Sequence, residues 1–175
     1  WPSDLVSTLI FIKVLFVVCV LMIIFVIDFE HYLILNVVLW PTAVIIFIFN
    51  VALDITASHS FFSLGSLWLS GLLAGLSAFL IFYALWAVSK GRWIGFGDVK
   101  LVFVMGLILG PSKLGIGLLL AFWLGALVSA PLVLLGKKQF SSKIPFGTFL
   151  SVATLIALLW GERLVHWYLV LIGLS

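Results

Sequence analysis

The stretch Gly95-Phe96-Gly97-Asp98-Val99-Lys100 sets a carboxylate and a lysine in a glycine-containing break at the edge of hydrophobic sequence. The segment after it, Leu101–Ser112, carries no charged side chain. An ionisable group at the margin of a membrane segment is expensive to desolvate, so Asp98 is a candidate functional residue. Its best partner in the sequence is Asp28, which also ends a long apolar run.

The composition points to a membrane protein. Of the 175 residues, 65% are hydrophobic and only 9% are charged, whereas a soluble domain carries about 25% charged residues. Lipid is therefore the expected solvent for most of the chain. The single cysteine, Cys19, excludes an internal disulfide and a cysteine-cluster metal site, and no metal or cofactor is expected. Nucleic acid is not an expected partner, because the lysines are not interleaved with exposed aromatics in a basic patch.

The apolar segments predict an all-α polytopic fold with six transmembrane helices in one domain, residues 1–175. A helix needs about 20 residues to cross the hydrocarbon, so the fourth segment is short and must have Asp98–Lys100 facing protein or a watery cavity. The residues 164–174 either extend the last helix or lie in the membrane interface. Gly71 and Gly75 have the spacing that lets another helix approach closely. The six expected segments are Leu5–Ile27, Leu33–Leu53, Leu64–Val88, Leu101–Ser112, Leu114–Gly136 and Ile144–Trp160.

The loop charges predict the orientation. If the first helix runs from outside to inside, the outer loops hold Lys113 and Arg163, and the inner loops hold six basic residues, as the positive-inside rule requires. Asp28 and Asp98 then both lie at the cytoplasmic face of a multi-pass membrane protein. The six inner basic residues are Lys90, Arg92, Lys100, Lys137, Lys138 and Lys143.

Two aspartates at one face could hydrolyse a peptide bond without a metal. Two close carboxylates cannot both ionise cheaply, so one keeps a proton while the other stays charged, and an acid and a base coexist. Each aspartate alone could equally mark the membrane boundary. Lys100 could stabilise a carboxylate or anchor its helix at the interface, and Glu30 and His31 could simply solvate the inner loop.

Three places in the sequence resemble the type IV prepilin peptidases, which are membrane aspartyl proteases with a Gly-x-Gly-Asp motif. Ile27-Asp28, with Asn36 eight residues on, is similar to the first motif of that family, and Gly95 to Leu101 matches the second closely. Ile144-Pro145-Phe146-Gly147, followed by Phe149-Leu150, is similar to a Pro-Phe-Gly-Pro-Phe signature. All three occur in order within the six expected spans.

The resemblance implies that the chain is an aspartic endopeptidase with Asp28 and Asp98 as the catalytic pair. The substrate would be a prepilin or pseudopilin of a type IV pilus or protein-secretion system, cut after its basic leader on the cytoplasmic side. Gly95, Gly97 and Lys100 would support the site. Pro145, Phe146 and Gly147 would line or support it near the cytoplasmic face, or merely start a closely packed helix. Glu30, the two aspartates or backbone acceptors would bind the basic leader, and inner-leaflet lysines would contact membrane lipid.

Two positions depart from the family pattern, and one part of many family members has no counterpart. Leu35 stands where the first motif usually has proline, and Thr148 replaces the second proline of the last motif. Neither change removes a carboxylate, so altered loop geometry is expected rather than lost chemistry. No residues match the cysteine-clustered methyltransferase domain, so that activity is not predicted for this chain.

Two other functions fit the aspartates. A Gly-x-Gly-Asp protease of the signal-peptide-peptidase type is one, although it would have Tyr-Asp where this chain has Ile27-Asp28. The other is a non-enzymatic, proton-coupled transporter with Asp28 and Asp98 as a relay. That function favours broken helices at the bilayer midplane and an internal repeat, and neither is evident in the sequence.

Overall fold

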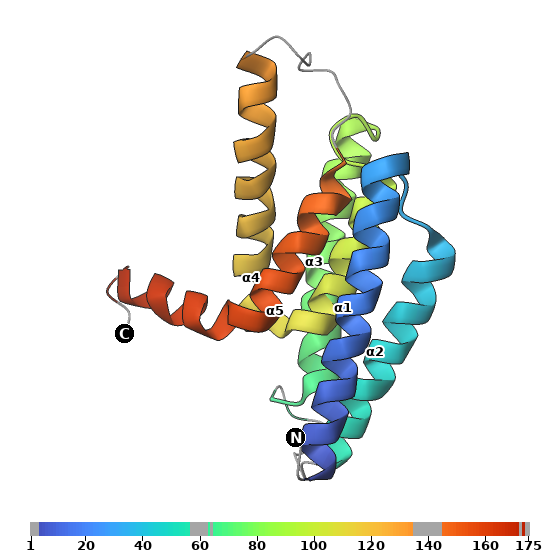
Figure 1. Cartoon of the computed structure of the whole chain (residues 1–175), viewed down its shortest axis with the longest axis vertical. Helices are drawn as coiled ribbons and strands as arrows, with labels where there is room; N and C mark the ends of the chain where they lie inside the picture. The colour runs from blue at the N-terminus through green and yellow to red at the C-terminus, as the bar shows by residue number, and fades with distance from the viewer. Residues whose placement is uncertain (1–3, 57–62, 64, 135–144, 172, 174–175) are drawn as a thin grey trace.

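The chain folds into a bundle of long helices (Figure 1). The computed structural model describes residues 4–56, 63, 65–134, 145–171 and 173, with the backbone alone for 131–134 and 171. Within these residues every regular element is an α-helix. The helices are α1 (Leu5–His31), α2 (Asn36–Thr56), α3 (Leu67–Ser89), α4 (Phe96–Leu134) and α5 (Phe146–Leu171).

The predicted class, an all-α multi-pass membrane protein, is confirmed. All five helices are long and apolar enough to cross a membrane. The predicted number of six helices differs from the structure, because the fourth and fifth expected segments form the single element α4. The expected sixth segment and most of residues 164–174 likewise form α5. The expected inner-loop residues Lys137, Lys138 and Lys143 lie outside the described residues.

Helix α4 changes direction at Gly110, which explains the different count. Gly110 has φ 68° and ψ −179°, a conformation that breaks the helix. Glycine readily adopts positive φ at the end of a helix, and proline is favoured at the first position of the next one. Pro111 follows Gly110 directly, so no loop separates the two limbs. Figure 1 shows the limbs running in opposite directions, from yellow-green to tan.

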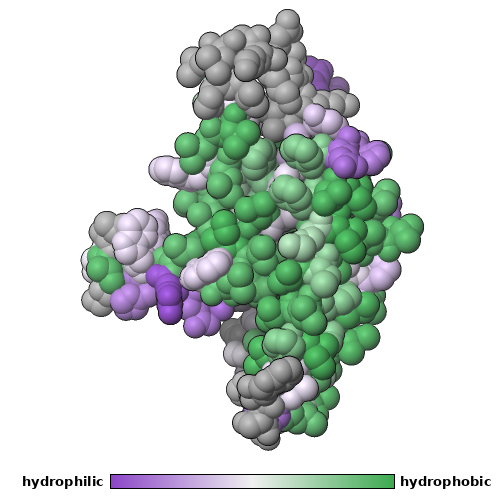
Figure 2. All heavy atoms as spheres, viewed as in Figure 1, coloured by the Kyte–Doolittle hydropathy of each residue, from purple (hydrophilic) through white to green (hydrophobic). Residues whose placement is uncertain are grey.

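The outside of the bundle is apolar over most of its length. Figure 2 shows hydrophobic residues covering the bundle, with hydrophilic ones gathered on the arm at the end of α5 and at the upper right of the view. Large apolar side chains on several helices are strongly exposed, among them Phe11, Ile48, Leu80 and Trp123. A monomeric soluble protein does not expose apolar surface on this scale, so these side chains face lipid.

The first limb of α4 is the centre of the bundle and packs closely on α3. Val99, Val102 and Met105 are fully buried. A Cβ atom on Gly106 would lie 2.3 Å from the Gly75 Cα atom, and one on Gly71 would lie 3.2 Å from the Leu107 carbonyl oxygen. The two backbones therefore touch, and the predicted close approach at Gly71 and Gly75 is confirmed. Dispersion contacts of this kind drive helix association where lipid removes the hydrophobic driving force.

Polar side chains of α1 and α2 form a chain of hydrogen bonds that supports the bend of α4. The Leu107 carbonyl cannot bond to the amide four residues on, because that residue is Pro111, which has no N–H. The Asn50 side-chain amide of α2 donates to this carbonyl instead, at 2.9 Å. The Asn50 Oδ1 atom in turn accepts a hydrogen bond from the Lys13 ammonium of α1, at 2.6 Å. Lys13, the one basic side chain within the apolar run of α1, thus faces other helices.

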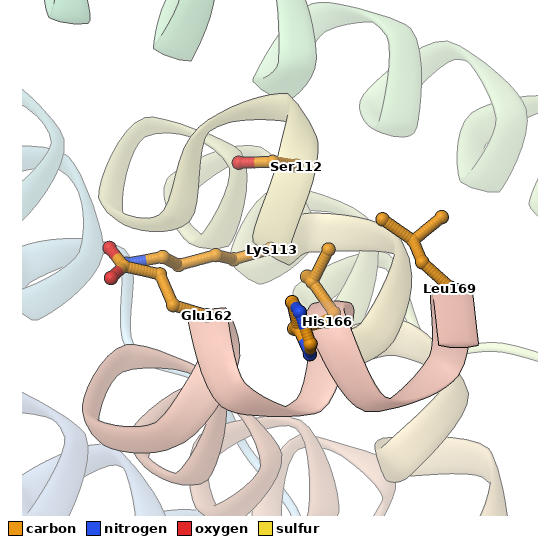
Figure 3. Close-up of a pocket in the computed structure, with 6 residues that line it drawn as sticks. Ser112, Lys113, Glu162, His166 and Leu169 are labelled. Carbon is orange, nitrogen blue, oxygen red and sulfur yellow. The ribbon is translucent and has the colours of Figure 1, made fainter. Parts of the chain in front are cut away.

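An ion pair joins α4 to α5 beyond the bend. The Lys113 ammonium lies 2.8 Å from the Glu162 carboxylate, and Figure 3 shows the two side chains pointing toward one another, with His166 farther along α5. The Lys113 stem lies against Gly161, where a Cβ atom would be 3.0 Å from Lys113 Cδ. In Figure 1 the last part of α5, in red, turns sideways and leads away from the other helices.

The contact between α3 and α4 yields a test with a matched pair of glycines. Gly106→Ala places a methyl group against the Gly75 backbone, so we expect a loss of about 3 kcal/mol in the free energy of unfolding. Gly115→Ala lies in the same helix and its Cβ atom meets nothing within 4 Å, so it should be neutral or slightly stabilising. Thermal unfolding of both variants in detergent micelles is the measurement. Equal melting temperatures would contradict the close packing.

The polar chain yields a second test. Asn50→Leu leaves both the Leu107 carbonyl and the Lys13 ammonium without this partner, and we expect a loss of about 1–3 kcal/mol in the free energy of unfolding. Thr154→Val is the control, because Thr154 is fully buried but its hydroxyl donates only to the carbonyl of Leu150 in its own helix. Chemical denaturation of the two variants measures the difference. The interpretation fails if Asn50→Leu is as stable as the control.

Candidate active site

Asp28 and Asp98 lie at the same end of the bundle, at the start of α5. Asp28 belongs to the last turn of α1, and Asp98 is the third residue of α4. Figure 1 shows the end of α1 and the starts of α4 and α5 at one end of the molecule. Both side chains are buried, with 4% of Asp28 and 9% of Asp98 exposed. The two carboxylates interact electrostatically with one another, although they are 70 positions apart in the sequence.

Asp98 is held by the turn that begins its own helix. Its backbone N–H donates to the Gly95 carbonyl at 3.1 Å, and its Oδ2 atom accepts from the Gly95 N–H at 3.3 Å. This reciprocal pair resembles a capping box, in which the third residue of a helix reaches back to the cap. The backbone amide of Gly147, in the first turn of α5, also interacts with the Asp98 carboxylate.

Asp28 is held by Thr148, the residue that follows Gly147 in α5. Its Oδ2 atom accepts two hydrogen bonds from Thr148, one from the backbone N–H at 2.6 Å and one from the hydroxyl at 3.0 Å. Amides in the first turn of a helix have no partner within the helix and attract negative charge. The start of α5 therefore supplies donors to both carboxylates, through Gly147 to Asp98 and through Thr148 to Asp28.

Two of the predicted glycines leave room around the pair. A Cβ atom on Gly147 would lie 2.8 Å from Asp28 Oδ2 and 2.7 Å from Ile34 Cδ1. A Cβ atom on Gly97 would lie 3.0 Å from Ile34 Cβ. Ile34, from the short connection between α1 and α2, thus lies between the starts of α4 and α5. Any side chain at either glycine would push against Ile34, and at Gly147 also against Asp28.

Lys100 links α4 to α2 and lies beside an aromatic ring. Its ammonium donates to the Asn36 side-chain oxygen at 2.7 Å and lies 4.7 Å from the centre of the Phe96 ring. Asn36 is the first residue of α2. The contact therefore fixes the start of α2 next to the Gly-x-Gly-Asp turn, which is a third possibility beside the two predicted for Lys100.

The remaining predicted residues divide into two groups. Pro145 directly precedes α5 and Phe146 is its first residue, with its ring centroid 5.2 Å from that of Phe122 in α4. Glu30 is exposed and lies 3.9 Å from the exposed His31, so it is accessible from the surrounding medium. The sequence did not indicate Ile34 or the two donors of Thr148. The only signal for Thr148 was its departure from the family pattern.

Two cavities in the described part of the molecule lie on other parts of the bundle. One of about 250 Å³ is lined by residues that include Ser112, Lys113, Glu162 and His166 (Figure 3). One of about 380 Å³ is lined mainly by aliphatic side chains, together with Lys13 and Lys113. Neither lining includes Asp28 or Asp98. Among the described residues, no three histidine, cysteine or acidic side chains gather in a metal-binding group.

Comparison with known proteins places this arrangement in context. Residues 15–130, which include both aspartates, match the model of the type IV leader peptidase family. No solved structure matches the chain.

The curated relatives carry the name prepilin leader peptidase/N-methyltransferase. The protein of Aeromonas hydrophila is 37% identical over 109 residues, which cover 62% of this chain and 38% of that protein. The protein of Pseudomonas aeruginosa is 30% identical over 149 residues, which cover 84% of this chain and 49% of that protein. The protein of Bacillus subtilis is 30% identical over 102 residues, covering 58% of this chain and 41% of that protein. The chain thus spans less than half the length of these relatives.

Proposed function

The chain belongs to the type IV leader peptidase family, and from this premise we propose that it is a membrane aspartyl endopeptidase that removes the basic leader of prepilins or pseudopilins. The resemblance inferred from the three sequence motifs is confirmed at the level of the family. The observation that carries the proposal is the meeting of Asp28 and Asp98 at the start of α5, with backbone amides directed at both. The named activity of the relatives supports the choice of substrate.

The proposed chemistry is activation of water between the two carboxylates. One carboxylate is ionised and removes a proton from water, and the other is protonated and donates to the carbonyl oxygen of the scissile peptide bond. Burial beside a second carboxylate opposes ionisation of both groups at once. The pair therefore acts as one unit with one proton, in a site from which neighbouring helices exclude most solvent.

The proposed substrate path follows from the apolar exterior of the bundle. The apolar helix of a prepilin would lie in the membrane beside the bundle, with its basic leader at the end where the aspartates lie. Glu30 is exposed near this end and carries the charge that a basic leader requires. The excess of basic loop residues in the sequence supports placing this end at the cytoplasmic face of the inner membrane.

Neutral isosteres test the pair directly. Asp28→Asn and Asp98→Asn should each reduce the cleavage of a prepilin peptide in reconstituted membranes by at least about 100-fold, because each removes one member of the acid–base pair. Asp4→Asn is the matched control, since Asp4 is an exposed aspartate that precedes α1. Melting temperatures measured beside the rates separate lost chemistry from lost folding. Cleavage at the normal rate by either variant would rule out the two-aspartate mechanism.

The space at Gly147 provides an independent test. Gly147→Ala should reduce the cleavage rate by about 100-fold, because its methyl group would displace the Asp28 carboxylate, and displacements of this size carry such costs. Gly125→Ala is the control, because its Cβ atom would make only ordinary contacts, the nearest at 3.5 Å to Phe149. Initial rates on the same prepilin peptide compare the two variants. If Gly147→Ala cleaves as fast as Gly125→Ala, Gly147 does not shape the site.

A further inference from the structure

The two oxygens of Asp28 have different surroundings. Both hydrogen bonds from Thr148 fall on Oδ2, at 2.6 Å and 3.0 Å. The two Thr148 donors occupy the two lone pairs of Oδ2, so a proton on this oxygen would have to displace one of them or make the Thr148 hydroxyl turn round and accept. The Oδ1 atom accepts none of the hydrogen bonds found among the described residues. Protonation of Oδ1, the oxygen that is left for water, keeps both Thr148 bonds and is therefore favoured.

The two carboxylates also differ in how well their negative charge is stabilised. Asp28 receives two donors on one oxygen, and the shorter bond has the length of a strong, charge-assisted hydrogen bond. The bond from Gly95 to Asp98 is 3.3 Å long, which is beyond the usual range for an N–H donor. Asp98 has the weaker local support, which comes from this bond and the Gly147 amide. When only one of the pair is ionised, the hydrogen bonds favour Asp28.

Thr148 is placed for this role by the start of α5. It is the third residue of the helix and is 5% exposed, so its N–H has no partner within the helix. The absence of a side chain at Gly147 lets the Asp28 carboxylate reach it. The hydroxyl adds a second donor that no apolar side chain of the same shape could provide.

We propose that Thr148 is a positioning residue that keeps Asp28 as the ionised base and leaves the shared proton on Asp98. This inference rests on the proposed peptidase function. Asp28 Oδ1 removes a proton from water while the water oxygen bonds to the scissile carbonyl carbon, and Asp98 transfers its proton to the carbonyl oxygen. Asp28 then donates to the amide nitrogen as the carbon–nitrogen bond breaks. Asp98 takes its proton back from a hydroxyl as the new carboxyl group forms, which restores both residues.

The test compares side chains that keep or lose the hydroxyl. Thr148→Val keeps the shape and the backbone N–H but removes the hydroxyl, and we expect kcat on a prepilin peptide to fall roughly 10-fold to 100-fold with little change in KM. Thr148→Ser keeps the hydroxyl and should retain kcat within about 3-fold, given the small cost of one lost methyl group. Thr154→Val makes the same change of side chain elsewhere in α5. It should cleave like the wild type, because the Thr154 hydroxyl bonds to the Leu150 carbonyl and not to an aspartate. If Thr148→Val fails to fold, Thr148→Ala carries the same prediction.

The outcomes distinguish the two proposals. A wild-type protein that does not cleave the peptide under any reconstitution would overturn the peptidase function itself. A wild type that cleaves, together with Thr148→Val at the same kcat, would overturn the role of Thr148 and leave the peptidase function standing. The role is also overturned if Thr148→Ser is as slow as Thr148→Val, because the hydroxyl would then not be the feature that matters.

Discussion

The free amides at the start of α5 are the constraint on which the site depends. A helix cannot use the first of its own N–H groups, and burying them without partners costs free energy. Here the partners are carboxylates from two other helices, Asp28 of α1 and Asp98 of α4. These bonds satisfy the first amides of α5 and also hold two acidic side chains close together, although like charges repel one another. The same hydrogen bonds therefore both stabilise the packing of α1, α4 and α5 and bring the two carboxylates together.

A second helix start in the protein shows what distinguishes this arrangement from ordinary capping. Asp54 of α2 also accepts two amides at the beginning of a neighbouring helix, but it uses Oδ1 for Leu67 and Oδ2 for Trp68. Asp54 is thus engaged through both oxygens by backbone donors. Asp28 uses one oxygen for its donors, and a second carboxylate lies close by. In the proposed mechanism, the neighbouring acid and the oxygen that accepts no hydrogen bond from the described residues suit Asp28 to proton transfer, rather than burial or capping.

The sequence predicts the helices and the meeting of the aspartates, because apolar length and helix order determine which helix ends share a face. It does not predict how the aspartates are held. Thr148 is visible only as a replaced proline, since nothing in a linear sequence directs a hydroxyl toward a residue 120 positions earlier. Asn50 is similarly hidden, because its role depends on the missing N–H of Pro111 in another helix. The number of helices differs because Gly110-Pro111 ends one helix and starts the next without an intervening loop.

The short first limb of α4 explains why Asp98 is sheltered. Residues 96–109 make about 21 Å of helix, which is less than the roughly 30 Å of hydrocarbon in a bilayer. Such a limb is stable only where other helices pack around it. Here α3 packs on it through the backbone of Gly75, and α2 bonds to it through Asn50. These contacts lie two to three turns from Asp98 on one rigid helix. The Asp98 carboxylate is thus positioned by packing deep in the bundle together with the Gly95 turn before its helix, while Asp28 is positioned by α5.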